Sequence, residues 1–238
     1  MYSLNSHSNV LVNGCSFSRG PDSWPYYLQS AYGFNLVNLA QAAAGNFYIH
    51  NATIYELGCR KYDLVLIMWS GLDRVDCQVD NIDFFHQTPH TSLTQSQQND
   101  WPEKIVQPVN DQDYVEKNWV FVCNGQDEFL KKIKFCESQF KFVGYDQKIQ
   151  QSLIHMISLQ SILKQLKIPY VFSFYQNYSN RLSTNPLFHL LDSTCVCNNN
   201  NIDSIAQKNK WLAEDKRHPA PQAHAAWAKE MQHFLTKI

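Results

Sequence analysis

Residues 63–69 read DLVLIMW and give the strongest strand signal in the chain. Their apolar side chains are continuous rather than alternating, which is typical of a strand covered on both faces in a parallel sheet. Shorter apolar runs at 10–12 and 34–39 precede this stretch, and another at 168–174 follows it. The pattern predicts a set of core strands within an α/β fold.

Helical spacing of apolar residues predicts the connections between these strands. We expect helices over 22–32, 42–57, 145–166 and 221–235, the second closed by Gly58 near its C-terminal end. Strands that alternate with helices in this way form an open, doubly wound sheet with parallel strands. Because such sheets bind ligands at the carboxyl ends of their strands, we expect the chemistry in the loops at that edge.

The alternation is lost between about 75 and 144. The stretch TSLTQSQQND at 91–100 is polar and without periodicity, and an insertion or lid is the simplest account of it. The segment WVFVCNG at 119–125 fits either an extra strand or a buried aromatic patch. We therefore expect a single domain over 1–238 with an insertion or lid at about 75–144.

Composition excludes several classes of function. The chain has 238 residues, of which 44% are hydrophobic, which is enough for a packed core. Its net charge of -1 produces no field that would attract nucleic acid. Neither a signal peptide nor an apolar run long enough to span a bilayer is visible. We expect a soluble cytoplasmic protein without a membrane partner, and its oligomeric state stays open.

The seven cysteines are an odd number, so at least one is unpaired within the monomer. Reduced thiols in a cytosolic protein are the expected reading. Cys195 and Cys197 form a C-x-C pair, but no second pair stands near them at zinc spacing. We therefore expect neither a metal nor a cofactor.

Two loops could carry a nucleophile and its base. The first is Gly14-Cys15-Ser16-Phe17-Ser18, a glycine-led turn directly after the first strand, where Ser16 would be a nucleophile or a simple cap. The second precedes the last helix and contains Asp215 and His218. There His218 could accept the Ser16 proton while Asp215 holds the other ring nitrogen, or Asp215 could merely cap the helix.

These two motifs resemble the first and last blocks of the SGNH/GDSL hydrolase family, and they stand in that family's order at opposite ends of the chain. Residues 38–46, which read NLAQAAAGN, resemble the second block, and residues 69–74, which read WSGLDR, resemble the third. The resemblance covers both ends of the chain but not 75–144. It implies a flavodoxin-like three-layer α/β/α sandwich with a mostly parallel central sheet.

The resemblance also implies a Ser-His-Asp hydrolase with an oxyanion hole. The N–H groups of Ser16 and of the second-block glycine would donate to the oxyanion. Gapless spacing from Asn38 puts Ala43 in the place of that glycine, but we favour Gly45, because a backbone without Cβ can approach the reacting centre closely. The amide of Asn46 would add another donor.

The third block departs from the family pattern. Where the family has G-x-N, this chain reads Gly71-Leu72-Asp73, and an ionised carboxylate would repel a developing oxyanion. Three explanations stay open: Arg74 or Asn46 supplies the missing donor, Asp73 turns away to pair with Arg74, or turnover is weak. Loss of one such donor typically costs about 10² to 10³ in rate.

The sequence therefore predicts an esterase or deacylase that acts on a small acyl ester, with a carbohydrate O-acetyl group as the substrate that the resemblance suggests. Activity should fall at acidic pH, because a protonated imidazole cannot accept the serine proton. Two alternatives stay open: an acyltransferase that uses the same residues, and a binding or structural protein on the same frame that has lost efficient turnover.

Overall fold

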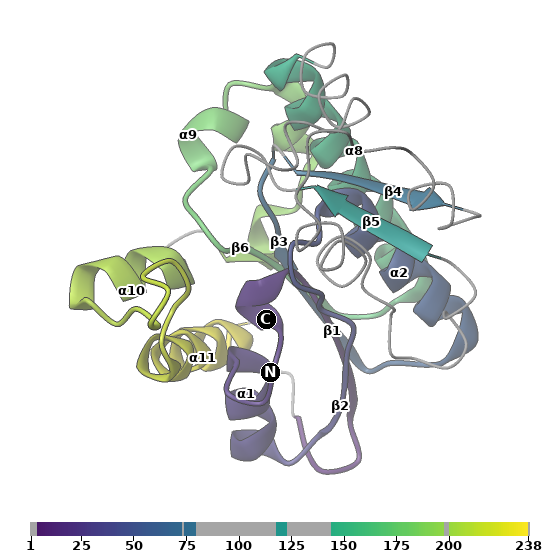
Figure 1. The fold of residues 1–238 in the computed structure, drawn as a ribbon. Coiled ribbons are helices and arrows are strands. Elements are labelled where there is room, and N and C mark those ends of the chain that lie inside the picture. Colours follow the sequence, from purple (N-terminus) through teal and green to yellow (C-terminus); the bar gives the residue numbers. More distant parts are fainter. Residues whose placement is uncertain (1–3, 73, 80–117, 123–143, 198–199, 238) are drawn as a thin grey trace.

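The computed structural model describes residues 4–72, 74–79, 118–122, 144–197 and 200–237. In this part of the chain, five parallel strands form the central sheet in the order β2-β1-β3-β6-β7 (Figure 1). The strands are β1 (Asn9–Asn13), β2 (Asn35–Asn38), β3 (Leu64–Trp69), β6 (Tyr170–Phe174) and β7 (Val196–Cys197). The chain winds outward from β1 to β2 and then crosses to β3 on the other side. The sheet therefore changes winding direction between β1 and β3, where α/β proteins place their ligands.

Helices cover both faces of this sheet, which gives the three layers that the resemblance implied (Figure 1). One face is covered by α2 (Asn46–Cys59) and α8 (Tyr145–Leu166), and the other by α1 (Trp24–Tyr32), α10 (Ile202–Asn209) and α11 (Pro221–Leu235). Adjacent strand residues point to opposite faces. In β3, Val65 packs with α2 and α8 while Leu66 packs with α1 and α11, and all six residues are buried. The continuous apolar run is thereby explained.

Two predicted helices, over 145–166 and 221–235, coincide with α8 and α11. The predicted helix over 42–57 differs at both ends. It begins at Asn46, because Ala43 has a positive φ of 64°, a left-handed conformation that a helix cannot contain. It also continues past Gly58, with Arg60 as its C-terminal cap. Residues 42–45 are instead a turn at the carboxyl edge of the sheet.

The described part of the predicted insertion forms a separate two-stranded antiparallel sheet. Its strands are β4 (Val75–Val79) and β5 (Asn118–Val122). The strand alternative for the WVFVCNG segment is therefore confirmed for its first four residues. The rest of the predicted insertion or lid lies outside the described residues.

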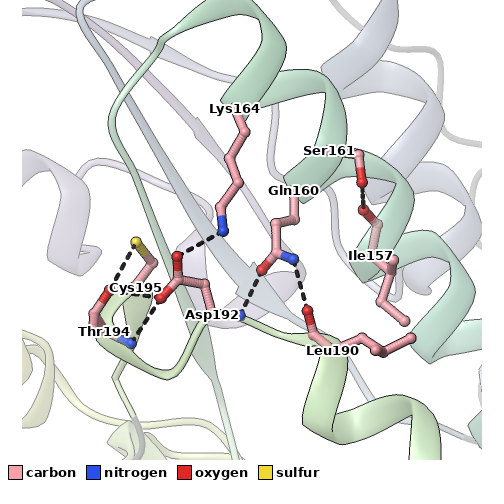
Figure 2. Close-up of polar contacts among 8 residues, drawn as sticks. All are labelled: Ile157, Gln160, Ser161, Lys164, Leu190, Asp192, Thr194 and Cys195. Atoms are coloured by element: carbon pink, nitrogen blue, oxygen red, sulfur yellow. Dashed lines mark hydrogen bonds and ion pairs between the residues drawn. The ribbon is translucent and has the colours of Figure 1, made fainter.

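The connection from β6 to α11 contains short elements that hydropathy did not predict. They are α9 (Ser179–Leu182), η2 (Pro186–Leu190), η3 (Ser193–Cys195), β7 and α10. Side chains of α8 fasten this connection, as Figure 2 shows: the Gln160 amide donates to the Leu190 carbonyl and accepts from the Asp192 N–H, and Lys164 pairs with the Asp192 carboxylate at 2.7 Å. Asp192 in turn caps η3 by accepting the Thr194 N–H. These contacts hold the chain in place just before β7.

None of the helices in the described ranges combines the length and apolarity that a bilayer crossing requires.

Candidate active site

The candidate nucleophile stands on a tight turn after β1. Asn13 ends the strand, and its side-chain oxygen accepts the N–H of Gly14 at 2.8 Å. A Cβ atom on Gly14 would lie 2.6 Å from Ser18 Oγ and 3.0 Å from the Met68 carbonyl oxygen, so the turn has no room for a larger residue. The single 3-10 turn η1 (Ser16–Ser18) follows immediately. Ser16 therefore lies at the carboxyl edge of the sheet, between the ends of β1 and β3.

Ser18 anchors this turn to its surroundings. Its side chain is buried, and its Oγ accepts the indole N–H of Trp24 at 3.0 Å. Its carbonyl accepts the side-chain amide of Asn38 at 2.8 Å, which ties the turn to the end of β2. Ser18 is thus held by α1 and β2, while Ser16 is only half-buried.

The candidate base lies on the loop before α11. An antiparallel bridge between Leu212 and Pro219 holds the two ends of the loop together. Inside it, Asp215 Oδ1 accepts the N–H groups of Arg217 and His218, each at 2.9 Å. Asp215 Oδ2 contacts His218 Nδ1 in a short hydrogen bond. The backbone and the carboxylate together fix the orientation of the imidazole.

The structure brings the three predicted side chains together. His218 Nε2 lies 3.0 Å from Ser16 Oγ, within hydrogen-bond distance. The order Ser16 Oγ, His218 Nε2, His218 Nδ1 and Asp215 Oδ2 is the arrangement in which an imidazole can accept a hydroxyl proton while a carboxylate stabilises the imidazolium. The side chains of His218 and Asp215 are 44% and 47% exposed, so water reaches both.

The pKa of Asp215 is held far below its usual range. The largest cause is the hydrogen bond from the His218 N–H, followed by the His218 side chain and the Arg217 N–H. Hydrogen bonds to the charged form of a carboxyl favour that form. Asp215 is therefore an anion at neutral pH.

Aromatic side chains pack beside His218. The Phe17 ring lies 5.4 Å from the imidazole, and Tyr175, which follows β6, lies 4.6 Å from Phe17 between ring centroids. The Arg74 guanidinium lies over the Tyr175 ring at 5.6 Å. These contacts join the loops after β1, β3 and β6 in one row that ends at His218.

The second-block turn, residues 39–45, runs beside the nucleophile turn. The Gln41 N–H donates to the Gly14 carbonyl at 3.2 Å, which joins the two turns directly. Ala43 takes its positive φ in the middle of this turn, and that conformation ordinarily favours glycine. This geometry explains why a glycine is expected at the position that gapless spacing assigns to Ala43.

Two of the predicted oxyanion donors are engaged elsewhere. The Gly45 N–H donates to Asp76 Oδ1 at 2.7 Å. The buried Asn46 amide donates to Ser152 Oγ at 3.0 Å, and Asn46 Oδ1 accepts the Ser70 N–H at 2.8 Å. Gly45 and Asn46 therefore join α2 to β4, α8 and the residue after β3 through these groups.

Comparison of the sequence with known proteins returned neither a matching family model nor a matching curated protein. Comparison of the structure returned solved structures that cover almost the whole chain. The esterase EstA from Pseudoalteromonas sp. shares 13% identity over 97% of both chains, with a TM-score of 0.52. A protein assigned to the G-D-S-L lipolytic family from Desulfitobacterium hafniense shares 11% identity over 96% of this chain and 99% of its own, with a TM-score of 0.51. The chain has the SGNH hydrolase fold.

A third solved structure with this fold is a catalytic mutant of Axe2, an acetylxylan esterase from Geobacillus stearothermophilus. It shares 11% identity over 98% of this chain and 96% of its own, with a TM-score of 0.51. At identities this low the likeness is one of fold. Roles for individual residues in this chain have to rest on its own geometry.

Within this SGNH fold, the third block is only partly described. Asp73, at the place of the family asparagine, lies outside the described residues. Arg74 is described, and its Nη1 donates to the Ala44 carbonyl at 2.9 Å, so the guanidinium lies between the second-block turn and Tyr175. Arg74 therefore contacts the second-block turn and Tyr175, and its role as an oxyanion donor stays a prediction.

Sequence reasoning missed two features of this site. Asp76 belongs to β4, inside the predicted insertion, and no periodicity marked it. The contact of Phe17 with His218 was also missed, since aromatic residues are far more often part of a core. In the described ranges, no three His, Cys, Asp or Glu side chains gather as metal ligands would.

Proposed function

We propose that the protein is a serine ester hydrolase. The observation that carries this proposal is the 3.0 Å contact between Ser16 Oγ and His218 Nε2, with the other imidazole nitrogen on Asp215. As His218 takes the hydroxyl proton, Ser16 Oγ attacks the ester carbonyl, and Asp215 stabilises the imidazolium. The proton then passes to the departing alcohol, and a water molecule activated by His218 releases the acyl group from Ser16.

The oxyanion of the tetrahedral intermediate needs backbone donors. The Ser16 N–H is the first of η1, and the leading N–H groups of a helical turn have no partner within it. For the second donor we propose the backbone of Ala43 in place of Gly45. Two observations support this choice: the positive φ of Ala43 matches a position that favours glycine, and the Gln41 N–H joins this turn to the Gly14 carbonyl, next to the Ser16 turn.

Arg74 supplies positive charge near this site. Its guanidinium lies over Tyr175 and donates to Ala44. We propose that it compensates for the missing third-block amide through its field, because a fixed cation near a developing oxyanion stabilises the transition state. An Arg74→Ala variant should therefore lose kcat with little change in KM.

We propose a small acyl ester of a carbohydrate as the substrate. The exposed side chains of His218 and Asp215 leave room for a bulky alcohol, and the partly buried Tyr175 ring, which packs on the buried Phe17 beside His218, provides apolar surface of the kind that packs against sugars. The acetylxylan esterase with this fold acts on such an ester. The same exposure favours water over a second alcohol as the acyl acceptor, because acyl transfer requires that water be excluded.

The test measures hydrolysis of a short-chain aryl acetate and of an acetylated xylooligosaccharide by the wild type, Ser16→Ala and Ser161→Ala. Ser161 is a matched control, because its hydroxyl is exposed on α8 and bonds only within that helix. We expect Ser16→Ala to lose at least about 10³-fold in kcat and Ser161→Ala to match the wild type. Equal rates for wild type and Ser16→Ala would remove the serine from the mechanism.

A fluorophosphonate gives an independent readout. Ser16 Oγ would attack phosphorus and expel fluoride, which leaves a stable adduct that mass spectrometry can locate. We expect the adduct on the peptide that contains Ser16, and no adduct in the Ser16→Ala variant. Labelling that persists in this variant would contradict the assignment.

A further inference from the structure

Asp76 is a buried carboxylate beside the second-block turn. It comes from β4, and its side chain accepts the Gly45 N–H at 2.7 Å and the Tyr48 N–H at 2.9 Å. Gly45 is the N-terminal cap of α2 and has no side chain with which to cap the helix. Asp76, which belongs to strand β4, therefore supplies the acceptor that a capping side chain of the helix itself normally provides.

The contact explains the glycine at position 45. A Cβ atom there would lie 2.7 Å and 2.8 Å from the two Asp76 carboxylate oxygens and 3.0 Å from Arg74 Cβ. The glycine is thus required for the approach of a carboxylate to the backbone. In the sequence the same glycine was interpreted as an oxyanion donor.

Asp76 and Arg74 hold consecutive residues of the same turn. Arg74 donates to the Ala44 carbonyl, and Asp76 accepts from the N–H of Gly45, the next residue. Arg74 is the last residue of the third block, and Asp76 stands two residues after it. One donor and one acceptor therefore fix the backbone on the C-terminal side of Ala43.

We propose that Asp76 is a positioning residue, which in its ionised form holds the second-block turn so that the Ala43 backbone faces the oxyanion. The proposal rests on the ester hydrolase function. A carboxylate can accept both N–H groups, whereas a protonated carboxyl keeps one acceptor oxygen and presents a donor to the other N–H. Protonation therefore releases one of the two contacts.

Burial makes this carboxylate unusually easy to protonate. Desolvation raises the pKa of Asp76 to about 6, against the opposing effects of the Tyr48 and Gly45 N–H groups and of Arg74. Arg74 is the charged group that acts on it among the described residues; α2 contributes backbone N–H groups. Loss of the ionised form on mild acidification should therefore loosen the turn in addition to any effect on His218.

The first test compares steady-state kinetics of Asp76→Asn and the wild type at pH 8. Asp63→Asn is the matched control, because Asp63 Oδ2 also accepts a backbone N–H, that of Asn9 at 2.7 Å, but at the amino edge of the sheet. We expect Asp76→Asn to lose about 10²-fold in kcat with KM within about twofold, since a small displacement of a catalytic group has such an effect. Wild-type kcat in Asp76→Asn would overturn the proposal.

The second test is the pH profile of kcat/KM. In the wild type, Asp76 has to be ionised and the His218 imidazole has to be neutral. The acid limb of the profile should therefore steepen toward a slope of two. In Asp76→Asn only the imidazole remains, and the slope should approach one; Asp63→Asn should keep the wild-type slope. Identical limbs in the wild type and Asp76→Asn would show that Asp76 has only a structural role.

The third test does not use activity and separates this proposal from the ester hydrolase function. Amide hydrogen exchange, corrected for intrinsic rates, is followed at Gly45 and Tyr48. We expect lower protection of these two amides in Asp76→Asn than in the wild type. In the wild type we expect lower protection at pH 5 than at pH 7.5, and this second comparison tests the proposal even if the variant does not fold. Unchanged protection overturns the positioning role, whereas absence of Ser16-dependent hydrolysis overturns only the enzymatic function.

Discussion

His218 Nε2 lies 3.0 Å from Ser16 Oγ, although 202 positions of sequence separate the two residues. Helix packing brings the ends of the chain together: α1, which follows the Ser16 turn, packs against α11, which follows the His218 loop. The apolar contact between these helices includes Trp24 and Trp227, both fully buried. Core packing on one face of the sheet thus sets a distance that decides whether a proton can pass.

Asp215→Asn should lower kcat by about 10² to 10⁴ without unfolding the protein. Asn keeps one oxygen for the Arg217 and His218 N–H groups but has no charge to stabilise the imidazolium. Because the side chain is 47% exposed, water can replace part of the lost interaction, which favours the lower end of this range. Steady-state kinetics on an aryl acetate measure the loss.

Asp192→Asn is a control for Asp215→Asn, because Asp192 also caps a short turn by accepting a backbone N–H. Asp192, however, contacts Gln160 and Lys164 of α8 rather than His218 (Figure 2). Its kcat should equal that of the wild type. An Asp215→Asn enzyme with wild-type kcat would mean that the imidazole needs no carboxylate, and the proposed proton relay would be incorrect.

Gly14→Ala should destabilise the fold by about 1–3 kcal/mol, the usual cost of overpacking. The added Cβ would lie 2.6 Å from Ser18 Oγ and 3.0 Å from the Met68 carbonyl. Neither the buried Ser18 side chain nor the β3 backbone can move away easily. Urea denaturation at constant m-value measures the change. Activity should fall as well, because the shift displaces the Ser16 turn.

Gly58→Ala is the control, since a Cβ at that position meets no atom within 4 Å and lies inside α2. This variant should gain about 0.4–1 kcal/mol, because alanine loses less backbone entropy than glycine on entering a helix. Equal destabilisation of both variants would show that space at Gly14 is not what the turn requires.

Elements with strong periodicity could be predicted from the sequence, and those held by isolated contacts could not. Helix α8 has apolar residues at helical spacing over its whole length, so its bounds were predicted correctly. Strand β7 has two residues, and its place depends on how Lys164 and Gln160 hold the chain before it. No local pattern encodes such a contact.

The candidate site shows the same division. Ser16, Asp215 and His218 stand in motifs with characteristic neighbours, and the Ser16 turn directly follows a predicted strand, at the edge where parallel sheets bind ligands. The choice between Ala43 and Gly45 depended on a single backbone dihedral angle and on a carboxylate from the predicted insertion. Neither can be inferred from residue types.

Ionisation of Asp76 should lower the free energy of unfolding. Because burial raises its folded pKa to about 6, its protonated form contributes stability that is fully present below the ordinary 3.8 and is lost as pH rises through 6. The difference in unfolding free energy between the wild type and Asp76→Asn should therefore move in favour of the wild type on acidification from pH 7 to pH 4. Its total change is about 3 kcal/mol at most.

The wild type and Asp76→Asn are compared by the difference between their free energies of unfolding. Buried histidines destabilise the fold on acidification in the same pH range, and this effect is common to both proteins. A wild-type minus Asp76→Asn difference that is constant with pH would mean that Asp76 has an ordinary folded pKa, and the pH part of the positioning proposal would fail with it.

His155 should destabilise the fold in acid. Burial, followed by the neighbouring His50, lowers its pKa to about 4, and its ring lies 5.0 Å from that of His50 and 5.6 Å from Phe47. The neutral ring contributes stability above the ordinary 6.5 that is lost as pH falls through 4. His155→Phe keeps the aromatic packing and takes up no proton, so it should lose less stability than the wild type between pH 6.5 and pH 4. Urea midpoints over this range measure the difference, and an NMR titration that places the His155 pKa near 6.5 would contradict the prediction.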